Sequence, residues 1–207
     1  MFQRAYRKQT EMQHRLQLDN DRQKEINLQT SLSSLKSQVD PHFLFNNFSI
    51  LSDLIEENPA DAHNFLNDLS DVYRYKLVNL NSDVVSVKDE LKMLHSYVEL
   101  VQTRFGEAVQ VEFPQGAKGK VPPLALQLLV ENAIKHNAHS LKQPLIIHIE
   151  VDGHHLTVRN EIQPLSSEIK STGLGITNLS ERYRLIANKG IEVINNHKEF
   201  AVKIPLL

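Results

Sequence analysis

Apolar side chains recur every three or four residues through the first half of the chain. One set has the a and d spacing of a two-helix seam and consists of Leu28, Leu32, Leu35 and Val39. The same period predicts a helix from about Pro59 to Val78 and a later helix that buries Leu91, Leu94, Val98, Val101 and Phe105. We therefore expect a helical hairpin plus one further helix, with the seam paired to a second helix.

The pattern changes at Gly106, the first glycine of the chain. Only two prolines precede it, whereas six glycines and six prolines follow it. Alternating and β-branched stretches predict strands at residues 109–113, 145–151, 156–160, 191–194 and 200–204, with helices at about 123–138 and 176–188 between them. We expect these elements to form a mixed or antiparallel sheet with helices on one face.

The two halves together predict an α+β fold, in which an amino-terminal coiled coil and helical hairpin precede an α/β sandwich. The expected divisions are a coiled coil over residues 1–34, a helical domain over 35–106 and an α/β domain over 107–207. The composition agrees with this interpretation, because 41% hydrophobic and 23% charged residues are typical of a soluble globular protein.

Charge and composition exclude several classes of protein. The formal net charge of −2 provides no general basic field for a nucleic acid backbone, so we expect no nucleic acid partner. The absence of cysteine excludes disulfide scaffolds, thiolate metal sites and thiol nucleophiles. No apolar run is long enough to span a bilayer and the first ten residues lack a signal-peptide core, so we expect a cytoplasmic protein.

The stretch from Glu131 to Asn137 lies on a predicted helix whose polar face is chemically selective. Glu131 and Lys135 are one turn apart, and Asn132 and His136 form a parallel row. Carboxylate and amide oxygens are ligands for Mg²⁺, while an ammonium group and N–H donors hold phosphate oxygens. The alternative is a solvated helix face with one Glu–Lys pair.

A glycine pair, Gly173 and Gly175, leads into the next predicted helix and is followed by Asn178. The free backbone N–H groups and the dipole at such a helix start can receive a phosphate group. The stretch lacks the preceding strand and the spacing of a dinucleotide fingerprint or a P-loop. An ordinary loop is therefore the alternative.

A third stretch, Val39 to Phe48, lies on the helical hairpin and gathers three phenylalanines around one imidazole. That imidazole belongs to His42, which stands one turn before Asn46 and shares a helix face with it. The alternative is a purely structural role for this stretch. Asp40 would then be the helix N-cap, Pro41 the first helical residue and His42 a partly exposed residue without a function.

Taken in chain order, with the histidine stretch first, the three stretches resemble the LytS/YehU-like class of sensor histidine kinases. In that class a Pro-His-Phe-Leu-Phe-Asn phosphoacceptor motif precedes a Bergerat-type (GHKL) ATP-binding domain, and the likeness spans roughly residues 35–185. Further positions similar to the family motifs are Leu69-Ser70 with Arg74-Tyr75, Glu90 with Tyr97 and Arg104-Phe105, and Glu131 to His136 as the N box.

The resemblance implies roles for these motifs. His42 would accept the phosphoryl group, Asn132 would bind Mg²⁺, and Lys135 and His136 would lie near the phosphate groups of ATP. The implied nucleotide site combines the N box with a glycine box and consists of Glu131, Asn132, Lys135, His136, Gly173, Gly175 and Asn178. The expected cofactors are ATP and Mg²⁺.

One position departs from the family pattern. Related ATP domains end a strand in Asp-x-Gly-x-Gly, whose carboxylate accepts a hydrogen bond from the adenine amino group. Residues 158–162 have neither that Asp nor those glycines. Asn160 is the nearest equivalent, and its side-chain oxygen can accept the same bond without charge assistance. We therefore expect weaker adenine recognition.

The group that orients His42 is open, because Phe43 follows where some kinases carry a carboxylate. The nearest acid, Asp40, faces elsewhere on an unbroken helix, unless a kink at Pro41 changes that facing. Asp40 is therefore either an orienting group or a plain cap. The candidate catalytic residues are His42, Asn46 and Asp40.

The implied function is that of a protein histidine kinase, which phosphorylates His42 and passes the phosphoryl group to an aspartate of a response regulator. The family also implies a homodimer. The basic start of the chain, with Arg4, Arg7 and Lys8, suits a junction just inside a membrane. We expect the cytoplasmic portion of an inner-membrane receptor, attached through a segment absent from this chain.

Two alternatives stay open. One is a degenerate, non-catalytic dimeric scaffold that binds nucleotide weakly or not at all. The other is a Bergerat-fold ATPase or chaperone, although such a protein would have no use for the histidine motif on a helical hairpin.

Overall fold

The computed structural model describes residues 41–79, 81–165 and 174–207, but not the side chains of residues 41 and 42. The predicted coiled coil over residues 1–34 and the seam from Leu28 to Val39 lie outside the described residues, as do Asp40 and Gly173. Internal contacts divide the chain between residues 49 and 50, and helix α2 (Pro41–Glu57) crosses this division. The predicted division into three domains remains a prediction.

Helix α3 (Pro59–Val78) has the bounds that its sequence predicts. The side chain of Asn58 caps it by accepting a hydrogen bond of 3.2 Å from the N–H of Ala60. Pro59 occupies the first helical position, where no N–H is needed. Asn–Pro in the sequence therefore marks the start of this helix directly.

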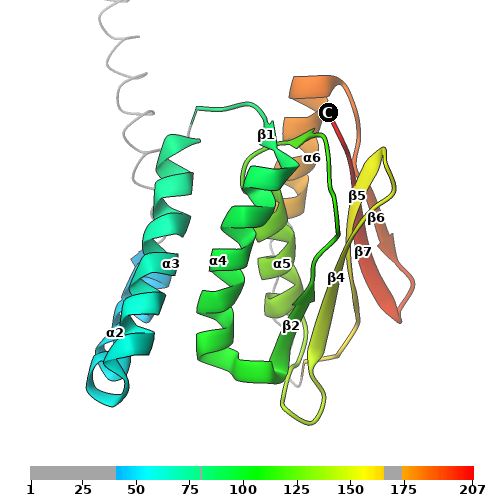
Figure 1. The fold of residues 1–207 in the computed structure, drawn as a ribbon. Helices are drawn as coiled ribbons and strands as arrows, with labels where there is room; N and C mark the ends of the chain where they lie inside the picture. The colour runs from blue at the N-terminus through cyan, green and yellow to red at the C-terminus, as the bar shows by residue number, and fades with distance from the viewer. Residues whose placement is uncertain (1–40, 80, 166–173) are drawn as a thin grey trace, which may run out of the picture. The chain divides into compact units, whose positions relative to one another are not determined.

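Helix α4 (Val87–Phe105) packs beside α3 (Figure 1). Ser86 caps its start by accepting a hydrogen bond of 3.1 Å from the N–H of Asp89, and Gly106 ends it with φ 57°, a left-handed value that favours glycine. The two helices bury apolar stripes at helical spacing, which include Phe65, Leu69, Val72, Met93, Leu94, Val98 and Val101.

The five-stranded sheet has the order β2-β4-β5-β7-β6. Its strands are β2 (Val109–Glu112), β4 (Leu145–Val151), β5 (His155–Glu161), β6 (Glu192–Asn195) and β7 (Glu199–Pro205). β2 and β4 are parallel and the other neighbours are antiparallel. The expected mixed sheet is confirmed, and with the preceding helices it confirms the α+β fold.

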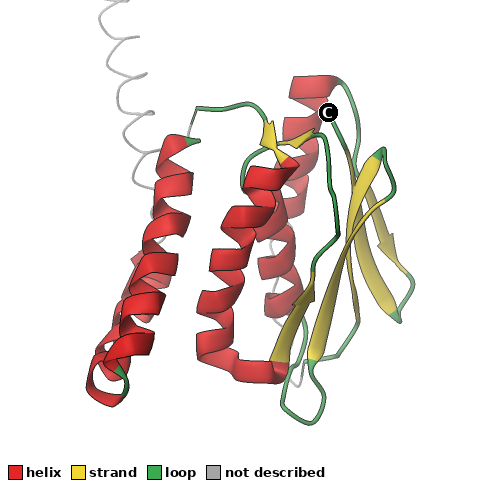
Figure 2. Ribbon diagram, in the orientation of Figure 1, coloured by secondary structure: helices red, strands yellow, loops and turns green. Residues whose placement is uncertain are grey.

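Helices α4, α5 (Ala125–His136) and α6 (Leu174–Ala187) lie on one side of this sheet (Figure 2). A second, two-stranded sheet pairs β1 (Val85–Ser86) with β3 (Lys120–Val121). The sequence did not indicate this pair, because two-residue strands are too short to show alternation. Among the described residues, no helix combines the length and apolarity needed to cross a bilayer.

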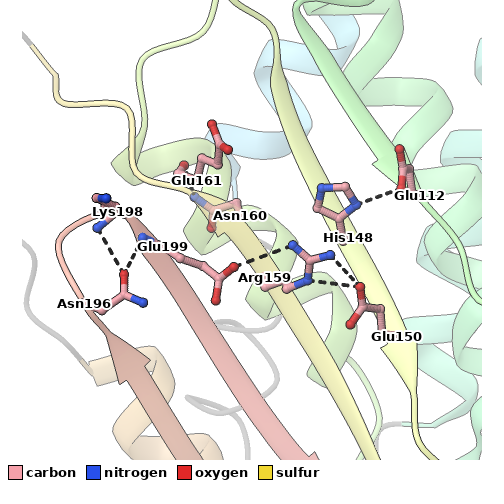
Figure 3. A network of polar contacts seen from close by, with 9 residues as sticks. All are labelled: Glu112, His148, Glu150, Arg159, Asn160, Glu161, Asn196, Lys198 and Glu199. Carbon is pink, nitrogen blue, oxygen red and sulfur yellow. Dashed lines mark hydrogen bonds and ion pairs between the residues drawn. The ribbon is translucent and has the colours of Figure 1, made fainter.

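Alternation along the strands gives the sheet two different faces. In β5 the side chains of Leu156, Val158 and Asn160 are buried, whereas Arg159 between them faces the other way. Arg159 donates two hydrogen bonds, of 2.6 and 3.0 Å, to Oε1 of Glu150, and its guanidinium lies 3.6 Å from the carboxylate of Glu199 (Figure 3). This charged outer face explains why helices cover only the opposite face.

Candidate functional site

A cleft of about 460 Å³ lies beside the carboxyl-terminal half of α5. Its other walls come from the first turn of α6, the residue after β5 and the adjoining ends of β6 and β7. The polar lining consists of Glu131, Asn132, Lys135, His136, Asn137 and Asn195. The remaining lining consists of Leu128, Ala133, Ile162, Leu174, Gly175, Ile176 and Phe200.

The amphipathic pattern of α5 places its polar residues in this cleft. Its core-facing side chains are buried and include Ala125, Leu126, Leu129, Val130 and Ala133. Asn132 and His136 are half-buried, while Glu131 and Lys135 are exposed. The structure therefore brings together the four polar residues that the sequence singled out on this helix.

The charges in the cleft suit a bound cation together with an anion. Burial and the neighbouring Lys135 ammonium lower the pKa of His136, which favours its neutral form. The cleft then offers one carboxylate, one ammonium group, an imidazole and three amide side chains. Carboxylate and amide oxygens fit Mg²⁺, and the ammonium and N–H groups fit phosphate oxygens. The residues present therefore fit the metal and the phosphate part of ATP.

Gly175, in the first turn of α6, lies against Leu128 of α5 within this cleft. A β-carbon added to Gly175 would stand 3.1 Å from Cδ1 of Leu128, closer than ordinary van der Waals contact. Both residues line the cleft. The glycine therefore allows the two helices to approach, which is a packing reason for a position that the sequence connected with phosphate binding.

Asn137 closes the end of the cleft and was not among the predicted site residues. It is 4% exposed, and its Oδ1 accepts a hydrogen bond of 2.8 Å from the N–H of Gln163. Its Nδ2 donates to the carbonyl of Ala133 over 2.8 Å. An amide side chain directly after a helix is the one feature of the sequence that points to Asn137. Its hydrogen-bond partner, Gln163, lies 26 residues away and could not be predicted from the sequence.

Two predicted nucleotide contacts do not line the cleft. Asn160 is 2% exposed on the inner face of β5 and donates a hydrogen bond of 2.7 Å to the carbonyl of Glu161. It pairs in register with Phe200, which does line the cleft. Asn178 is exposed on α6, outside the lining. Phe200, Ile162 and Asn195 are lining residues that the sequence did not single out.

The proposed phosphoacceptor lies on α2. His42 is its second residue, and Asn46 follows one turn later with a half-buried side chain. Asn47 donates a hydrogen bond of 2.6 Å to the carbonyl of Phe43. Phe45 and Phe48 are 67% and 48% exposed, so α2 presents aromatic surface rather than a closed core.

Comparison with known proteins agrees with these motifs. Residues 30–109 match the model of the family described as histidine kinase. The chain is 33% identical over 172 residues to the sensor protein LytS of Staphylococcus saprophyticus, covering 73% of this chain and 29% of that protein. It is 32% identical over 188 residues to the sensor protein LytS of Enterococcus faecalis, covering 81% of this chain and 32% of that one.

The chain thus spans less than a third of the length of these curated relatives. Among solved structures, the cytoplasmic segment of histidine kinase QseC is 16% identical, with a TM-score of 0.43, covering 66% of this chain and 94% of that one. The chain belongs to the histidine kinase family, within the group of LytS-like sensor kinases.

Proposed function

We propose that this chain is the kinase core of a two-component sensor histidine kinase. It phosphorylates His42 with ATP and then transfers the phosphoryl group to an aspartate in the receiver domain of a response regulator. The observation that carries this proposal is the cleft beside α5, where Asn132, Lys135 and His136 stand together opposite Gly175. This is the combination of groups that a metal-bound triphosphate requires.

The side chains of α5 have separate tasks in the proposed site. Asn132 and Glu131 provide oxygen atoms for Mg²⁺, and the Lys135 ammonium and the His136 imidazole hold phosphate oxygens. When bound, Mg²⁺ supplies neutralisation of the charge on the phosphate groups. The apolar wall, which includes Ile162 and Phe200, excludes water from one side of the cleft.

His42 is the proposed nucleophile. An imidazole is largely neutral at pH 7 and offers a lone pair. A bond forms between its ring nitrogen and the γ-phosphorus, the bond from that phosphorus to the bridging oxygen breaks, and ADP leaves. We propose Asn46 and Asp40 as the groups that orient the ring. The proton on the attacking ring passes to solvent or to the carboxylate of Asp40.

We also propose that the chain works as a homodimer and as the cytoplasmic part of a membrane receptor. Large apolar side chains stand exposed on α2 and α3, and they include Phe45, Phe48, Ile55, Leu66 and Leu77. Exposed apolar surface of this kind is typical of helices that pair with a partner. The relatives named sensor proteins are more than three times longer than the matched segment, which leaves room for a membrane part.

Incubation of the purified chain with Mg²⁺ and γ-labelled ATP tests the reaction. We expect an acid-labile, base-stable phosphate on His42, which His42→Gln abolishes while nucleotide binding persists. The matched control is His63→Gln, which replaces an exposed helical histidine on α3 and should keep the label. Retention of the label in His42→Gln would refute the assignment.

A non-catalytic scaffold is the second candidate, and the environment of Asn160 favours it. That residue replaces the expected carboxylate, is buried, and uses its amide N–H in a bond to the backbone. A wild type that binds Mg-ATP, as shown by a raised melting temperature, but acquires no label would favour the scaffold. A labelled wild type excludes it.

A further inference from the structure

Glu90 of α4 is a fully buried carboxylate that the proposed reaction does not use. Its Oε2 accepts hydrogen bonds from the hydroxyl of Tyr75 on α3, over 2.6 Å, and from the N–H of Leu124, over 3.0 Å. Its Oε1 accepts a hydrogen bond of 3.0 Å from the N–H of Leu126 in α5. One side chain therefore joins three helices.

Helix α5 begins without a side-chain cap of its own. Leu124, at the N-cap position, has a left-handed φ of 65° and makes no side-chain hydrogen bond there. The first N–H groups of a helix have no partner within the helix, and a negative charge at that end is stabilised by the helix dipole. Glu90 supplies, from α4, the cap that Leu124 cannot supply.

Arg182 of α6 binds the segment that directly precedes α5. Its Nη1 donates to the carbonyl of Pro123 over 3.1 Å, and its Nη2 donates to the carbonyl of Ser82 over 3.0 Å. Ser82 lies between α3 and β1, while α6 begins at the wall of the cleft. The connection between α3 and α4 is therefore bonded to α6, and the same guanidinium is bonded to Pro123, two residues before α5.

The carboxylate is stable only while its donors stay in place. Burial raises the pKa of Glu90, and the hydrogen bonds from Tyr75 and from the amides of Leu124 and Leu126, with the nearby Arg182, act in the opposite direction. A buried charge that loses a partner is strongly destabilised. This requirement favours a single arrangement of α3 relative to α5.

We propose that Glu90 is a positioning residue, which couples α3 to the cleft helix α5 through the hydroxyl of Tyr75. The inference rests on the proposed function, because α3 follows the helix of the proposed phosphoacceptor and α5 carries the proposed nucleotide contacts. The coupling itself is a property of the chain without any ligand. It can therefore be measured separately from phosphorylation.

Tyr75→Phe tests the coupling, since it removes one hydroxyl and leaves the ring and Glu90 in place. The matched control is Tyr183→Phe. The Tyr183 side chain is fully buried and interacts electrostatically with Glu90, but its hydroxyl has no hydrogen-bond partner among the described residues. Hydrogen exchange of the ligand-free full chain is followed at residues 124–128. We expect exchange there to rise by about fivefold or more in Tyr75→Phe and to stay unchanged in Tyr183→Phe.

Kinetics of the same variants provide the second measurement. A positioning role predicts that Tyr75→Phe lowers kcat for phosphorylation by about fivefold or more while KM for ATP changes less than about twofold. Tyr183→Phe should match the wild type in both constants. Glu90→Gln should raise the exchange and lower kcat more strongly than Tyr75→Phe does. If Glu90→Gln fails to fold, Tyr75→Phe alone tests the coupling.

The outcomes separate the two proposals. Unchanged exchange at residues 124–128 in Tyr75→Phe would overturn the coupling, and so would a kcat equal to that of an active wild type. Raised exchange in a chain whose wild type acquires no label would support the coupling and overturn the proposed function instead. A loss of stability with unchanged exchange and kinetics would reduce Tyr75 to a packing role.

Discussion

Oδ1 of Asn137 accepts a hydrogen bond of 2.8 Å from the backbone N–H of Gln163. This bond joins the end of α5 to the segment that leaves β5, and Gln163 adds a bond of 3.0 Å from its Nε2 to the carbonyl of Pro144. Both amide side chains are buried. The end of the cleft is therefore fixed by the hydrogen bonds of two buried amide side chains and not by apolar packing alone.

Asn137→Ala should lower the free energy of unfolding by about 1–3 kcal/mol, because it leaves the buried N–H of Gln163 without its acceptor. Urea denaturation measures the change. The control is Asn67→Ala, at an exposed amide on α3, which should change stability by less than about 0.5 kcal/mol. Equal effects of the two substitutions would show that the Asn137 bond contributes nothing specific.

Gly175→Ala should weaken Mg-ATP binding by about threefold to tenfold, since the new methyl group displaces Leu128 at the wall of the cleft. Titration calorimetry with Mg-ATP gives the dissociation constant. Gly190→Ala is the matched control, because a β-carbon there meets nothing within 4 Å. If both variants bind Mg-ATP with wild-type affinity, the contact of Gly175 with Leu128 does not shape the site.

Asn132→Ala and Asn132→Asp should impair the use of Mg-ATP without unfolding the chain. The amide is half-buried on the cleft face of α5, so its loss should cost less than about 1 kcal/mol of stability. We expect loss of the label on His42 and a loss of Mg²⁺-dependent nucleotide binding. Nucleotide binding measured in EDTA is the control and should not distinguish wild type from Asn132→Ala. Wild-type phosphorylation by both variants would remove Asn132 from the metal site.

His136 should contribute a pH-dependent part of the stability. Its pKa is lowered by burial and by Lys135, so the folded chain holds the proton less strongly than the unfolded chain does. This contribution is present above the ordinary histidine pKa of about 6.5 and is lost as the pH falls through the lowered value. The melting temperature of the ligand-free wild type should therefore drop more than that of His136→Gln between about pH 7.5 and pH 5.5. Parallel curves for the two proteins would contradict this expectation.

Light scattering at tens of micromolar should give twice the mass of one chain. Ile55→Asp and Leu66→Asp should shift the chain toward monomer, because each places a charge on an exposed apolar position of α2 or α3. Leu185→Asp on α6, at a side chain that is 86% exposed, is the matched control and should remain dimeric. A wild-type mass equal to that of one chain would contradict the proposed homodimer.

Local sequence patterns predicted most of the elements. The Asn58-Pro59 pair gave the start of α3, and the 3.6-residue period gave the two faces of α5. The exceptions depend on contacts between distant residues. The predicted start of α5 near Pro123 is wrong by two residues, because Leu124 adopts a left-handed conformation and the helix begins at Ala125. Nothing near Leu124 in the sequence indicates that its N–H is held by Glu90, 34 residues away.

The candidate site was predictable where one helix carries it and unpredictable where several elements meet. Glu131 lies one turn before Lys135, and Asn132 lies one turn before His136, so helical geometry alone brings these residues together. Phe200 and Asn195 reach the same cleft only through the register of β6, β5 and β7. The buried side of Asn160 also follows from that register, since strand alternation leaves open which of two faces is the inner one.

The cap that Glu90 places on α5 determines where this chain can be divided and joined to another. A segment cut at residue 107 would leave the cap behind, together with β1, which pairs Val85 with Val121. The amides of Leu124 and Leu126 would lose their acceptor, and the apolar face of α4 would be missing from the helical layer. The smallest portable module that keeps both the cleft and the cap of α5 therefore starts before Val85, and a chimera joined there carries its own helix cap.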